Sequence, residues 1–278
     1  MVLPFQKFNN EGEQLLYAAK MILASLNYKK AIDGDTLPVD KKGGKPLDMG
    51  QYKKLFGTYR IPVVQSDSLS FNNSNFIAVL HNGHPFACPL WGEDNVLLSE
   101  AQIVNQLKKI ISQSQQTASH PVGILTSEQR DTWSRVYKDL SQDSTNKASL
   151  KALEQSLFVL CLDKGTSSLG DEKWEKQTIA AGEVIHGNGS KNNSGNRWFD
   201  KILQLIVSPN GMNGVTYEHS PAEGQPIAIL MDHIINYIVN NKSSDATSSS
   251  SVKDIKKLEF NLTPDIEDSI NKTKLNID

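Results

Sequence analysis

The sequence has little cysteine and no surplus of either charge. Only two cysteines occur in 278 residues, Cys88 and Cys161, and they lie in different segments with no Cys-x-x-Cys spacing. Such a pair supports neither a disulfide framework nor a zinc knuckle. The 29 basic and 31 acidic side chains leave a net charge of −2. Because no basic stripe is present, we expect no nucleic acid among the partners.

Long apolar runs are missing as well. No segment approaches the roughly 18 consecutive apolar residues that a membrane-spanning helix needs. Met-Val-Leu-Pro at the start leads into a polar stretch, so no signal or transit peptide is visible, and Asn276-Ile277-Asp278 is not a peroxisomal tripeptide. The sequence therefore predicts a soluble protein with no transmembrane segment and no readable targeting signal.

The apolar residues that are present alternate between helical and strand periods. A helix is expected over 11–29, and a hairpin over 75–90 around Asn82-Gly83, a strong two-residue turn signal. Ser99 with Gln102 forms a capping box that opens the next helix. Further expectations are a short strand at Val122–Leu125 with Ser127 capping the helix after it, helices at 147–156 and 177–186, strands at 157–162, 202–207 and 215–218, and a helix from Pro226. This mixture predicts an α/β fold, a mixed sheet with flanking helices.

A serine-rich stretch divides the chain. Residues 243–251 have the composition of a flexible linker, and apolar periodicity returns after it. We expect a domain over 1–241, a linker over 242–257, and the start of a further connection over 258–278.

His219 is the best candidate for a chemical role. A strand is expected to end at Glu218 and a helix to begin near Pro226, so His219 lies on a short connection at the edge of the sheet. Imidazole, with an ordinary pKa of about 6.5, can act as a general base near neutral pH. Glu223, through its side chain or its backbone carbonyl, can accept from the second ring nitrogen and fix the tautomer. Taken alone, a histidine before a turn is more often structural.

Several motifs together resemble a known family. His219-x-x-x-Glu223-Gly224 is similar to the His-x-x-x-Asp-Gly signature of the chloramphenicol acetyltransferase fold, with Glu in place of Asp. The segments 51–62 and 189–201, and Tyr217-Glu218-His219, resemble the choline/carnitine acyltransferase family. The segments 121–126 and 161–164 are most similar to its carnitine-acetylating members. The resemblance extends from residue 2 to 278.

The resemblance implies one half of a two-half fold in which each half resembles chloramphenicol acetyltransferase. It implies direct acyl transfer between acyl-CoA and carnitine, with His219 as the catalytic base and Glu223 in the orienting segment. CoA and acyl-CoA are then substrates, and neither a resident cofactor nor a metal is expected. The family also implies fatty acid metabolism in mitochondria or peroxisomes.

Family features expected from a second half are missing from these residues. That half supplies a Ser-Thr-Ser segment, lysines for the CoA phosphates and most carnitine contacts, and residues 258–264 resemble the link that leads into it. An aromatic-rich stretch upstream of residue 1 is likewise missing. We therefore expect a truncated enzyme that is inactive alone, or else an inert fragment or interaction domain with the same fold. Acyl-chain length, carnitine against choline, compartment and oligomeric state are not readable.

Other candidate residues have structural interpretations. The segment 187–191 lacks the spacing of a phosphate loop, and the His81-x-x-His84 pair spans a turn without further metal ligands. Arg60 and Arg197 are expected in structural ion pairs, and Trp133 and Trp198 in the core. His186, beside a Gly-Asn-Gly-Ser segment, is the second choice for a base.

Overall fold

The centre of the molecule is a six-stranded mixed sheet. The computed structural model describes residues 1–165, 172–241 and 251–278. The strands lie in the order β10 (Lys256–Lys257), β6 (His84–Pro89), β5 (Phe76–His81), β7 (Val159–Leu162), β8 (Leu203–Val207) and β9 (Asn213–Tyr217). β7 pairs in parallel with β5 and β8, and the other neighbours are antiparallel. The predicted α/β fold with a mixed sheet is confirmed.

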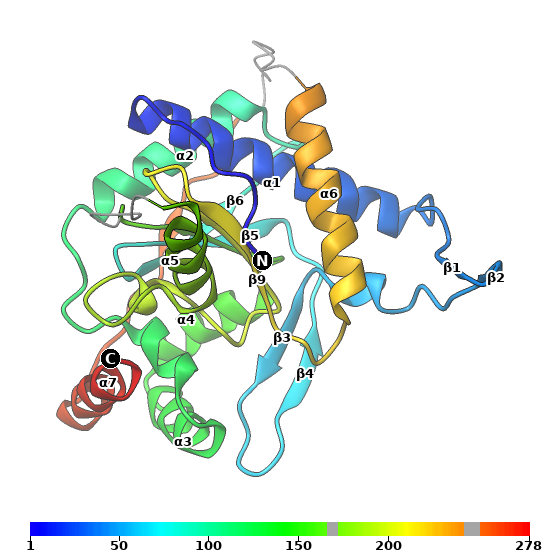
Figure 1. Cartoon of the computed structure of the whole chain (residues 1–278). Coiled ribbons are helices and arrows are strands. Elements are labelled where there is room, and N and C mark those ends of the chain that lie inside the picture. The colour runs from blue at the N-terminus through cyan, green and yellow to red at the C-terminus, as the bar shows by residue number, and fades with distance from the viewer. Residues whose placement is uncertain (166–171, 242–250) are drawn as a thin grey trace.

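Helices cover both faces of this sheet (Figure 1). One face carries α1 (Glu11–Asp33), α2 (Glu100–Gln113) and α6 (Gly224–Asn240), and the other carries α3 (Arg130–Leu140), α4 (Ser144–Gln155), α5 (Lys173–His186) and α7 (Pro264–Ile277). The strand β7 is apolar throughout because it is covered on both faces. Leu160 and Leu162 pack into the core beneath α1, α2 and α6, whereas Val159 and Cys161 pack into the core beneath α3, α4, α5 and α7.

Two predictions from short motifs are confirmed in detail. Asn82 and Gly83 join β5 to β6 with φ of 53° and 78°, the positive values that a mirror-image hairpin turn requires. Ser99 and Gln102 form both bonds of the capping box at the start of α2. The turn between β5 and β6 and the start of α2 thus follow from local sequence signals.

The expected strand at Val122–Leu125 is wrong. Val122–Ser127 forms the 3-10 helix η2, and the helix α3 after it is capped by Gln129 rather than by Ser127. The hydroxyls of Thr126 and Ser127 donate to backbone carbonyls within η2, at 2.7 Å each. Those carbonyls are therefore engaged locally, and side chains that bond back to their own backbone compete with strand formation.

A second hairpin lies beside the main sheet. β3 (Thr58–Ile61) and β4 (Ser68–Phe71) pair with each other and project from the body of the molecule (Figure 1). The backbone amide of Arg60 donates to the carbonyl of Asp200 at 2.8 Å, which attaches this hairpin to the segment before β8. Shorter elements are β1 (Lys41–Lys42), β2 (Lys45–Pro46), η1 (Tyr52–Lys54) and η3 (Ser194–Asn196). The hairpin matters because it brings Arg60 to the end of β9.

The predicted linker is described only in part. Residues 242–250 lie outside the described residues, and within the remainder of 242–257 the strand β10 pairs with β6. The division of the chain into domain, linker and connection stays a prediction.

Alanine at Gly57 is expected to destabilise the fold more than alanine at Gly43. Both glycines have positive φ, 73° and 58°, so the backbone strain of an L-residue is common to both. A Cβ at Gly57 would lie 1.7 Å from the carbonyl oxygen of Asn72, whereas at Gly43 it would meet nothing within 4 Å. We expect losses of unfolding free energy of roughly 3 kcal/mol or more against about 1 kcal/mol. Urea unfolding measures both, and equal losses would contradict the close approach.

Candidate active site

His219 lies in the connection between β9 and α6, as predicted. Its imidazole is exposed, and Nε2 lies 3.6 Å from a carboxylate oxygen of Glu223, the N-cap residue of α6. That distance fits an ion pair with a protonated ring and exceeds a hydrogen bond. The ring of Tyr217 lies 5.5 Å away, centroid to centroid. The two predicted site residues are thus neighbours, and the roles assigned to them stay predictions.

The backbone around His219 is fastened on both sides. Glu218 donates its backbone amide to the carbonyl of Ile202 at 2.9 Å. At the other end, the backbone amide of Glu223 donates to the side-chain oxygen of Gln51 at 2.8 Å. The segment is therefore held by the protein body while the imidazole itself remains open. This combination suits a group that must meet a substrate in a defined geometry.

An open cavity of about 370 Å³ borders this segment. Tyr217 and Glu218 line it from the end of β9, Phe199 contributes an apolar wall, and Arg130 a charged one. His186, the second choice for a base, lines the same cavity from the end of α5. His219 itself is not one of the residues that line this cavity. A wall with both apolar and polar groups can receive a small amphipathic substrate.

Two arginines that line the cavity form a chain of ion pairs with two aspartates. Arg60 and Arg130 both bind one oxygen of Asp67, at 2.6 and 2.7 Å from their Nε atoms. Arg130 continues to Asp200 at 2.6 Å, and Asp200 accepts from the indole of Trp133 at 2.6 Å. Burial raises the pKa of the Asp200 carboxyl to about 6, although Arg130 and Trp133 oppose the shift. Sequence reasoning expected Arg60 in an ion pair but missed its partners.

Comparison with known proteins identifies the family. The family model for Choline/Carnitine o-acyltransferase matches residues 1–278. The chain belongs to the choline/carnitine acyltransferase family. It is 42% identical over 284 residues to carnitine O-acetyltransferase of Columba livia and 41% identical to that of Mus musculus, in each case over 100% of this chain and 44% or 45% of the relative. It is also 33% identical to choline O-acetyltransferase of Rattus norvegicus, over 94% of this chain and 42% of the relative.

The chain therefore spans less than half the length of these relatives. Within the described segments of this family member, no helix is long and apolar enough to cross a membrane. Among the same residues, no group of three or more His, Cys, Asp and Glu side chains is placed to hold a metal ion.

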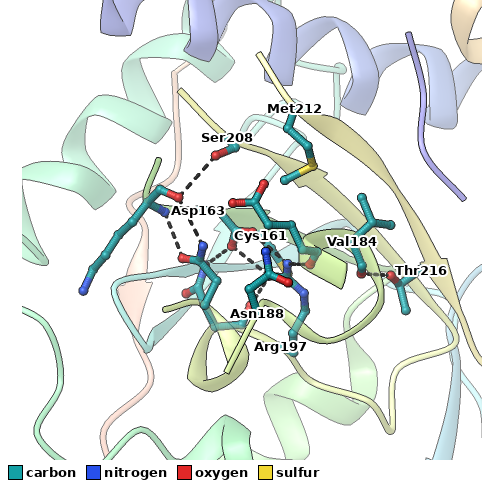
Figure 2. Close-up of polar contacts among 12 residues, drawn as sticks. Cys161, Asp163, Val184, Asn188, Arg197, Ser208, Met212 and Thr216 are labelled. Carbon is teal, nitrogen blue, oxygen red and sulfur yellow. Dashed lines mark hydrogen bonds and ion pairs between the residues drawn. The ribbon is translucent and has the colours of Figure 1, made fainter. Parts of the chain in front are cut away.

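One residue of the segment 189–201, Arg197, forms a buried ion pair. Arg197 and Asp163 have fully buried side chains and form two parallel bonds of 2.7 Å each (Figure 2). Arg197 also donates to the carbonyl of Glu183 at 2.6 Å, and Asn196 donates to Asp163 at 3.0 Å. The expectation that Arg197 is a structural ion-pair partner is confirmed, and Trp198 lies in the core with no exposed surface, as expected.

Lys201 makes stability depend on pH. Its side chain is buried, and its ammonium donates to the carbonyl of Glu154 at 2.8 Å. Burial lowers the pKa of Lys201 from 10.5 to about 7. Between these two values the unfolded chain binds a proton that the folded chain lacks, so Lys201 makes stability rise with pH across that window and costs most below it.

A Lys201→Met variant is expected to lose this dependence. From pH 7 to pH 9, the unfolding free energy of the original chain should rise by about 2 kcal/mol more than that of the variant. Urea unfolding at both pH values measures the difference, in which all other titrations cancel. Parallel pH profiles would show that Lys201 stays protonated in the fold.

Proposed function

We propose that this chain carries the histidine-bearing half of an acyltransferase that exchanges a short acyl group between CoA and carnitine. The observation that supports it most is the place of His219, whose imidazole is open while its flanking backbone is bonded to the body of a choline/carnitine acyltransferase domain. The identity of 40–42% to carnitine O-acetyltransferases, against 32–33% to choline O-acetyltransferases, favours carnitine as acceptor and acetyl as the acyl group.

The proposed step needs one proton acceptor. The neutral imidazole of His219 takes the proton of the carnitine hydroxyl while its oxygen attacks the thioester carbonyl. The new carbon–oxygen bond forms, the carbon–sulfur bond breaks, and the CoA sulfur takes the proton back from the imidazolium. Glu223, 3.6 Å from Nε2, is placed to stabilise that imidazolium. No covalent acyl-enzyme is required, and CoA enters and leaves as a substrate.

The 278-residue chain alone is expected to show no measurable transfer. Residues beyond this half are proposed to supply the other wall of the site and the donor to the developing oxyanion, and such a donor contributes about 10²–10³ in rate. A hybrid enzyme, in which the C-terminal part of the Columba livia enzyme follows Asp278, is expected to release thiol from acetyl-CoA in the presence of carnitine.

The matched comparison uses the chain, the hybrid enzyme and the hybrid with choline in place of carnitine. Activity of the hybrid with carnitine supports the proposal. Activity of the chain alone within about tenfold of the hybrid would show that this half is sufficient, for example as a homo-oligomer. A folded hybrid that transfers nothing would favour the alternative of an inert interaction domain.

A further inference from the structure

The carboxylate of Glu218 holds the turn that carries His219. One oxygen, Oε2, accepts from the backbone amide of Ser220 at 2.9 Å, so the side chain reaches across His219 to the residue after it. Asp and Asn side chains stabilise turns by bonding the backbone two residues on, and the Glu218 carboxylate makes the same kind of contact here. Together with the bond from the Glu218 amide to Ile202, this fastens the backbone of the residues before and after His219.

Arg60 holds that carboxylate in place. Its Nη1 lies 3.1 Å from the other oxygen, Oε1, and its Nε binds Asp67 at 2.6 Å. The Glu218 and Asp67 side chains are only 18% and 9% exposed, so the pairs are shielded from salt better than surface pairs. Both ends of the guanidinium are therefore occupied, and its plane is set before any substrate arrives.

The second arginine connects this pair to the core. Arg130 shares Asp67 with Arg60 and binds Asp200, whose side chain has no exposed surface. Asp200 in turn is bonded to the buried Trp133. The contacts thus run without a break from a core tryptophan to the residue that precedes His219.

We propose that Arg60 and Glu218 are positioning residues for His219. Glu218 sets the backbone of the turn, Arg60 sets Glu218, and neither accepts the proton. The inference rests on the proposed function of His219 and differs from the role given to Glu223, which faces the imidazole directly. A loosened turn leaves the base present but misaligned, and misplacement by about 1 Å costs up to about 10² in rate.

The first test measures the hydrogen bond between the Ser220 amide and the Glu218 carboxylate in the 278-residue chain. In NMR spectra, the amide proton of Ser220 should be shifted downfield of its position in an unfolded peptide, because the Glu218 carboxylate accepts its hydrogen bond. Glu218→Ala should abolish this shift and Arg60→Gln should weaken it. Arg135→Gln, at an exposed position of α3, is the control and should leave it unchanged. A Ser220 shift that survives in Glu218→Ala would overturn the proposal.

The second test separates kcat from KM in the hybrid enzyme. Arg60→Gln is expected to lower kcat by about tenfold or more, with KM for carnitine and acetyl-CoA within about twofold, and Arg60→Lys to recover part of the loss. The double variant that combines Arg60→Gln and Glu218→Gln should have the same kcat as Glu218→Gln alone or a higher one, because Arg60 acts through Glu218. His219→Gln distinguishes the two proposals: if it is inactive while Arg60→Gln keeps full kcat, only the positioning role fails. If His219→Gln is active, the base assignment fails as well.

Discussion

Replacing His219 by alanine in the hybrid enzyme is expected to lower kcat by roughly 10²–10⁴, the usual contribution of a general base. At 1.36 kcal/mol per decade, this is about 3–5 kcal/mol of barrier. The KM values for carnitine and acetyl-CoA should stay near those of the parent, because the proton moves only as the reaction proceeds. The fold should be unaffected, since the imidazole is exposed and its ion-pair partner Glu223 is exposed as well.

The matched control is His186→Ala, because His186 lines the cavity that borders the His219 segment. It should leave kcat within about threefold of the parent. Initial rates of thiol release, with carnitine and acetyl-CoA varied separately, give kcat and both KM values. A large loss in His186→Ala together with a small loss in His219→Ala would assign the base to the end of α5 instead.

Replacing Asp163 by leucine is expected to lower the free energy of unfolding by about 3–5 kcal/mol. The change leaves Arg197 fully buried without its carboxylate partner, and the two bonds of 2.7 Å are lost together. Breaking one side of a buried pair costs far more than the pair contributes, because an uncompensated charge remains in the interior.

Two further variants identify the cause of that loss. Asp163→Leu with Arg197→Met removes both charges and should recover much of the stability. Asp268→Asn breaks the exposed pair with Lys272 on α7 and should change stability little. Urea unfolding of the 278-residue chain measures all three. A double variant as unstable as Asp163→Leu would show that packing, rather than the buried charge, is responsible.

Those parts of the fold that depend on residues close together in the sequence could be predicted from it. Asn82-Gly83 dictates its turn through positive φ, and Ser99 caps α2 through a residue three positions on. The strand predicted for 122–125 was wrong because its apolar residues suit a strand or a 3-10 helix equally. Hydrogen bonds from two hydroxyls to carbonyls within the segment favour the 3-10 helix that forms. No local pattern distinguishes those cases.

In the candidate site, too, contacts between residues near in sequence could be predicted and contacts between distant residues could not. His219 lies only four residues before Glu223, the N-cap residue of α6, so their proximity follows from the short connection between β9 and α6. Arg60 and Glu218 are 158 positions apart and meet only because the β3–β4 hairpin is attached beside β8. Such a partnership depends on tertiary structure, and nothing in the sequence near either residue indicates it.

The central claim, that His219 is the base for acyl transfer, is tested most directly by the single-turnover rate of acetyl transfer to carnitine. Excess hybrid enzyme is mixed with limiting acetyl-CoA, so that product release does not mask the chemical step. We predict that His219→Ala slows this step by about 10² or more. Retention of more than about a tenth of the parent single-turnover rate by a folded His219→Ala variant would contradict the claim.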